Sequence, residues 1–177
     1  MRPRATTVAA TWGALLLQCA VLHAQSPVTR AVQRHEARAA RNLTEAAAAM
    51  PEDRYAFRPT PAQTTFGDLV LQVAAGNFFR CTAIMGTTLP PQHMLAATDP
   101  KDLLVGRLRS SFDLCNAALE HADDSFLEDS VASVGGHRIT RARALIELAV
   151  DWADHYAQMA MYLRLNGLLP PSAKHKE

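Results

Sequence analysis

A carboxylate and an imidazole stand four residues apart in the last third of the sequence, in a stretch with helical periodicity. Asp151 and His155 would therefore lie on one face of a helix, with Glu147 one turn earlier. Two such groups on one face can point at a single metal ion or a single substrate. The alternative is a simple Asp–His pair at the edge of a helical bundle, partly exposed to water. The spacing leaves both alternatives open.

A second helical stretch offers a polar residue that could meet this pair. Leu69, Gln72, Gly76 and Phe79 share one face by a spacing of three and four. Gln72 would either hydrogen-bond across the bundle to Asp151 or His155, or lie in solvent, which is the commoner position of a helical Gln. Gly76 would let a neighbouring helix approach closely or leave room for a ligand.

The cysteines suggest a disulfide. Three are present, and Cys19 lies in a segment that we expect to be removed, which leaves Cys81 and Cys115. A bridge needs their Cα atoms within about 7 Å and would contribute about 3 kcal/mol of stability. The alternative is two buried free thiols. No Cys-x-x-Cys spacing supports a thioredoxin-like redox role or covalent c-type haem.

Residues 1–24 are predicted to be a secretory signal peptide. Arg2 and Arg4 precede an apolar run that is short for a membrane span, and Ala24 is a small residue suited to cleavage. The expected mature chain, residues 25–177, would be periplasmic or extracellular and free of the membrane. An uncut anchor and a lipoprotein attached through Cys19 are the alternatives.

Composition limits the remaining choices. The 177 residues are 49% hydrophobic and 20% charged, with a formal net charge of +1. These values are typical of one globular domain and argue against disorder. The near-neutral charge also argues against a basic nucleic-acid-binding protein. We therefore expect no nucleic-acid partner.

The sequence predicts four helices, which must position Gln72, Asp151 and His155. Proline, glycine and capping signals place them at about 28–50, 65–85, 100–121 and 140–166. The last helix carries an apolar stripe formed by Leu145, Leu148, Trp152, Met159 and Tyr162. No strand signal is convincing, although 129–134 could form a short extended piece. The predicted fold class is all-α, a four-helix bundle.

An ordered set of short motifs resembles the DinB-like superfamily, and more narrowly its exported bacterial members. The resemblance covers about residues 28 to 172. It rests on Arg41-Asn42-Leu43, Met50-Pro51, Arg58-Pro59-Thr60-Pro61, Thr65-Phe66-Gly67-Asp68-Leu69, His155-Tyr156, Tyr162-Leu163-Arg164-Leu165-Asn166-Gly167 and Pro170-Pro171-Ser172.

This resemblance implies a four-helix bundle, often a homodimer, that holds zinc or nickel through three histidines. Those histidines fall on Gln72, Asp151 and His155, so only His155 matches. Some relatives are thiol-dependent transferases or isomerases. The positions of Cys81 and Cys115 also look like those of exported relatives.

Two functional hypotheses follow. An amide oxygen is a weak metal ligand, so the first is a non-catalytic binding or structural module with a degenerate metal site. Its pocket would include Gly76, Glu147, Trp152 and Tyr156 and could take a small molecule. The second is a divalent-metal-dependent hydrolase or thiol-dependent transferase whose altered ligand set is Gln72, Asp151 and His155. The cofactor is accordingly none, or a weakly bound zinc or nickel ion, and no catalytic residue is assigned.

Overall fold

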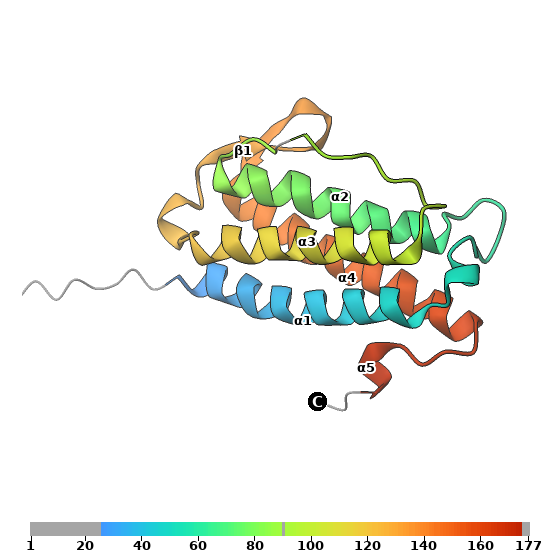
Figure 1. The fold of residues 1–177 in the computed structure, drawn as a ribbon. Helices are drawn as coiled ribbons and strands as arrows, with labels where there is room; N and C mark the ends of the chain where they lie inside the picture. Colours follow the sequence, from blue (N-terminus) through green and yellow to red (C-terminus); the bar gives the residue numbers. More distant parts are fainter. Residues whose placement is uncertain (1–25, 90, 175–177) are drawn as a thin grey trace, which may run out of the picture.

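Four long helices form the body of the protein in the computed structural model, which describes residues 26–89 and 91–174. They are α1 (Pro27–Ala49), α2 (Phe66–Met85), α3 (Lys101–Glu120) and α4 (Arg141–Leu165). They pack side by side as a bundle (Figure 1), which confirms the predicted fold class. The predicted signal segment, with Cys19, lies outside the described residues. None of the described helices is long and apolar enough to cross a membrane.

Local sequence sets most helix ends. The hydroxyls of Thr65 and Thr140 accept hydrogen bonds from the backbone N–H of Asp68 and Arg143, and so cap α2 and α4. Gly86 ends α2 in the left-handed conformation, with φ +70°. The start of α1 differs, because the Ser26 side chain makes no capping bond and the carboxylate of Asp124, far along the chain, accepts from the N–H groups of Val28 and Thr29.

Helices α2 and α3 run parallel, which a short connection between neighbouring helices would not allow. Figure 1 shows the segment after α2 returning along the bundle before α3 begins. The side-chain pairs agree with this direction. Asn77 contacts Ser111, and four residues later on both helices Cys81 is bonded to Cys115. The Cα atoms of the two cysteines are 5.1 Å apart. Of the two alternatives from the sequence, the structure therefore has the disulfide and not two free thiols.

A small hairpin interrupts the helical pattern between α3 and α4. Strands β1 (Ser130–Ala132) and β2 (Arg138–Thr140) pair antiparallel, with Val131 opposite Ile139. Gly135 and Gly136, both at φ +78°, make the turn. The sequence indicated only the first extended piece. The rest of the described chain adds 3-10 turns η1 (Glu52–Arg54), η2 (Asp124–Phe126) and η3 (Val134–Gly136), and the short helix α5 (Pro171–Lys174).

The core is centred on Trp152. All five members of the predicted α4 stripe are buried, and Trp152 is fully so. The rings of His35 on α1 and Phe112 on α3 flank its indole, at centroid distances of 6.1 Å and 5.8 Å. Trp152 is therefore in contact with the side chains of at least two other helices.

A buried amide satisfies the polar edge of this tryptophan. Asn77 on α2 has no exposed surface. Its Oδ1 accepts from Trp152 Nε1 at 2.6 Å, and its Nδ2 donates to Ser111 Oγ at 3.0 Å. One side chain thus joins α2, α3 and α4. Since a buried donor without a partner is costly, these bonds restrict how the three helices can slide.

We predict that Asn77→Ala destabilises the protein by about 2–4 kcal/mol, because it removes both hydrogen bonds of the Asn77 amide, orphans the Trp152 N–H and leaves a cavity. The Ser111 hydroxyl keeps its bond to the backbone oxygen of Leu108. Ser111→Ala is the matched control. It removes one of these bonds and should cost about 1 kcal/mol. Equilibrium unfolding in urea measures both. Equal stability of the two variants would contradict a central role for Asn77.

Candidate functional site

The structure places a cation from α2 against the carboxylate predicted to face a metal. Arg80 Nη2 lies 3.1 Å from Asp151 Oδ1, and the two side chains are only 21% and 17% exposed. Gly76 makes room for this contact. A Cβ at position 76 would lie 2.6 Å from Arg80 Nη1 and 3.3 Å from Asp151 Oδ2. The open space beside Gly76 is therefore occupied by a guanidinium group.

His155 lies beside the same carboxylate but donates its proton elsewhere. Its Nδ1 is 2.9 Å from the backbone oxygen of Asp151, one turn earlier, and 3.6 Å from Asp151 Oδ2. A carbonyl oxygen only accepts, so Nδ1 carries the hydrogen. In the neutral ring only Nε2 then has a lone pair with which His155 can accept a hydrogen bond or bind a metal.

Two buried atoms of the ion pair have no hydrogen-bond partner among the residues that the structure describes. They are Arg80 Nε and Asp151 Oδ2. The pair is thus held by one short contact rather than by a two-pronged arrangement, which would be stronger. The charges of Arg80 and Asp151 cancel, but one donor atom and one acceptor atom of the pair remain without a hydrogen bond.

The other residues singled out from the sequence have separate surroundings. Gln72 is exposed on α2. Glu147 Oε1 accepts from Arg143 Nε at 2.7 Å, and Tyr156 Oη donates to Ser172 Oγ at 2.8 Å. Trp152 points into the core, towards Asn77. The structure therefore brings Gly76, Asp151 and His155 together, and adds Arg80.

Sequence reasoning missed Arg80. Its signal was present, because Arg80 follows Gly76 by four residues and so lies on the same face of α2. A cation one turn from a glycine, on the helix opposite an acid, is the pattern of an interhelical ion pair. The pairing depends on the register between α2 and α4, which places Arg80 beside Asp151 and is not contained in either helix alone.

The donor set does not fit a divalent metal. An ion placed at Asp151 would meet the positive guanidinium of Arg80 at contact distance. Within residues 26–89 and 91–174, no three His, Cys, Asp or Glu side chains are grouped so that they could hold a metal ion. One imidazole and one carboxylate already paired with arginine fall short of the ligands zinc or nickel requires.

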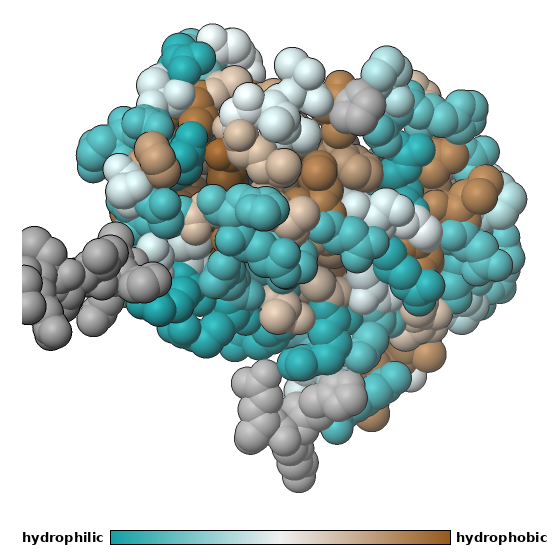
Figure 2. All heavy atoms as spheres, turned by 60° about the vertical axis from the view of Figure 1, so that its left-hand side comes forward, coloured by the Kyte–Doolittle hydropathy of each residue, from teal (hydrophilic) through white to brown (hydrophobic). Residues whose placement is uncertain are grey.

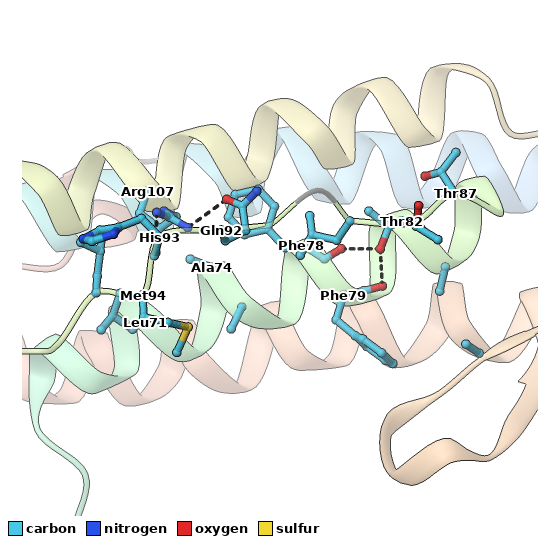
Figure 3. A pocket seen from close by; sticks show the side chains of 16 residues that line it. Leu71, Ala74, Phe78, Phe79, Thr82, Thr87, Gln92, His93, Met94 and Arg107 are labelled. Atoms are coloured by element: carbon cyan, nitrogen blue, oxygen red, sulfur yellow. Dashed lines mark hydrogen bonds between the residues drawn. The ribbon is translucent and has the colours of Figure 1, made fainter.

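A groove lies elsewhere on α2. It has a volume of about 480 Å³ and runs beneath the segment that returns along the bundle, as Figure 3 shows. We call residues 87–89 and 91–95 of that segment the strap. Figure 2 shows apolar residues gathered in the upper half of the molecule, the level at which α2 lies in Figure 1. None of the site residues predicted from the sequence lines this groove.

Glu36 is a buried acid away from both places. It lies on α1, is 5% exposed, and is close enough to Asp113 and Glu120 of α3 to feel their charges. Burial, and to a smaller extent the negative charges of Asp113 and Glu120, together raise its pKa from 4.5 to about 7. The folded protein therefore keeps this carboxyl protonated over a range in which the unfolded chain loses the proton.

Comparison with known proteins gives the fold. No family model and no curated protein matches the sequence. Solved structures do match. A DinB-like protein from Bacillus subtilis has 14% identity and a TM-score of 0.64 over 83% of this chain and 94% of that one. A DinB-like protein from Bacillus cereus has 14% identity and a TM-score of 0.65 over 80% and 95%.

A mutant of a mycothiol-dependent maleylpyruvate isomerase also matches, with 12% identity and a TM-score of 0.60. The alignment covers 74% of this chain and 60% of that longer one. The chain therefore has the DinB-like fold, as the sequence motifs predicted. Identities this low concern the fold and not the activity.

We predict that Arg80→Met destabilises the protein by about 1 kcal/mol at neutral pH, because Asp151 would lose its counter-ion in a partly buried place. Arg143→Met is the control. Arg143 pairs with Glu147 within α4 and its side chain is 67% exposed, so its loss should cost less than about 0.5 kcal/mol. Thermal or urea unfolding tells them apart. An Arg80 variant as stable as the control would remove the ion pair from the list of stabilising contacts.

We predict that Glu36→Gln stabilises the protein by about 1–3 kcal/mol at pH 8 and leaves it unchanged at pH 4. The sign follows from the raised pKa. Below 4.5 both states are protonated, and as pH rises towards 7 only the unfolded chain releases its proton, which lowers stability. Glutamine removes that loss. Urea unfolding at the two pH values measures the difference, and an equal effect at both would contradict the raised pKa.

Proposed function

We propose that this chain is a non-catalytic binding module with the DinB-like fold, in which an arginine takes the place of a metal cation. The observation that supports this is the 3.1 Å contact between Arg80 and Asp151 beside Gly76. The positive charge that would otherwise come from an ion is covalently part of α2. The protein then needs no metal to hold α2 against α4.

The chemistry of the remaining groups supports the same proposal. A metal-activated reaction needs an ion that polarises a substrate or lowers the pKa of bound water. Here the carboxylate is neutralised by a guanidinium, Gln72 is exposed, and His155 offers a single lone pair. These groups can anchor one another, but they supply no Lewis acid. The degenerate-site hypothesis is therefore preferred over an altered metal enzyme.

We propose further that the module works outside the cytoplasm. The disulfide between Cys81 and Cys115 supports this location, since such bonds persist in oxidising compartments. The signal-like residues 1–24 point the same way. A homodimer stays a prediction from the sequence resemblance.

Metal content tests the proposed function. We expect elemental analysis of the purified protein, prepared without chelators or a histidine tag, to give zinc and nickel far below one ion per chain. The triple variant Gln72→His, Arg80→Met, Asp151→His removes the competing cation and offers three imidazoles, since position 72 lies one helical turn before Gly76, which faces Asp151. Calorimetry should show it binding zinc at least 100-fold more tightly than the parent.

Two controls make this test decisive. The double variant Gln72→His, Asp151→His keeps Arg80, and should bind zinc more weakly than the triple variant because the guanidinium remains at the site. Circular dichroism checks that each variant is helical. Near-stoichiometric metal in the parent, or micromolar zinc affinity, would overturn the proposal and revive the metal-dependent enzyme.

A further inference from the structure

The groove on α2 has the size and lining of a small-molecule site. Its volume of about 480 Å³ falls in the range of such sites. Leu71, Phe78 and Phe79 of α2 form one side, and Met94 and Leu95 of the strap contribute to the other. The lining residues on α2 extend from Leu71 to Ala83, so the groove is about 18 Å long. Its shape suits an elongated ligand.

Part of this apolar lining is in water. Met94 is 85% exposed, Phe79 is 38% exposed and Leu89 is 37% exposed. Three large apolar side chains along one groove are unfavourable to leave hydrated, and a patch of this kind on a single-domain protein marks a binding site. A ligand with an apolar body would cover them.

The groove carries one fixed positive charge. Arg107 of α3 is the sole Lys, Arg, Asp or Glu among the described residues that line it. Its guanidinium lies 5.8 Å from the centre of the Phe78 ring. Nη1 donates to Gln92 Oε1 and Nη2 to the backbone oxygen of His93, both at 2.9 Å, so Arg107 also ties the strap to α3.

Within residues 26–89 and 91–174 this charge has no acidic counterpart. None of the ion pairs found in the described chain includes Arg107. The two hydrogen bonds are to neutral oxygens and use two of the five N–H donors of a guanidinium. Figure 3 shows Arg107 and His93 near Leu71 and Met94, with Phe79 and Thr82 further along α2. The cation is thus near one end of an apolar channel.

We propose that this groove binds a medium-chain fatty acid, with its carboxylate at Arg107 and its alkyl chain along α2 towards Phe79. An anionic head would neutralise Arg107 and an unbranched chain would cover the exposed apolar side chains. The inference rests on the proposed function only in treating the chain as a binding module. The groove and the Arg80–Asp151 pair share no residue, so metal analysis and lipid binding fail independently.

Isothermal titration calorimetry with laurate, below its micelle-forming concentration, tests the proposal on the full purified protein. We expect one laurate per chain with micromolar affinity. Dodecyltrimethylammonium has the same alkyl chain and a positive head, and should bind at least tenfold more weakly because Arg107 repels it. No binding of laurate would overturn the proposal. Equal binding of the two ligands would overturn the role of Arg107.

Three variants locate the site. Ala75→Trp fills the groove from an exposed position of α2 and should abolish laurate binding, whereas Ala153→Trp, on an exposed position of α4 outside the groove, should leave it unchanged. Arg107→Met should weaken laurate binding at least tenfold and leave the ammonium ligand no weaker than before. Laurate binding that survives Ala75→Trp would place the ligand elsewhere and sink the proposal, provided that circular dichroism shows the variant folded.

Discussion

The hydrogen bond between Asn77 and Trp152 fixes the height at which α2 faces α4. Both groups are fully buried, so neither can exchange its partner for water. Each is directly preceded by a residue at the edge of the bundle. Gly76 comes directly before Asn77, and Asp151 directly before Trp152. Once the buried pair is in register, Gly76 and Asp151 must lie close to each other, and Arg80, one turn further along α2, reaches the carboxylate.

The ion pair therefore depends on the core rather than the reverse. A single salt bridge that is one-fifth exposed contributes little by itself, whereas the indole, the amide and the disulfide hold the helices whatever charge stands beside them. Arg80 and Asp151 bring opposite charges together between α2 and α4, so this part of the helix interface carries no net charge.

The parallel direction of α2 and α3 accounts for the groove. Two neighbouring helices that run the same way need a connection as long as themselves. That connection runs back along α2 (Figure 1), and its residues line the groove together with those of α2. Arg107 ties it down at one place. Apolar side chains remain partly open between the tie and the helix, and the groove that results is a property of the topology.

Local sequence determined the four helices, their ends and the buried stripe of α4, because capping residues, prolines and a period of 3.6 act over one or two turns. It also put Asp151 and His155 on one face, and Gln72 and Gly76 on another. It could not show that Asp124 caps α1, that β2 pairs with β1, or that Arg80 meets Asp151, since each partner is distant in the chain. The surroundings of Gln72 and the groove beneath the strap were decided only by tertiary packing, because exposure and cavities depend on how whole helices lie together.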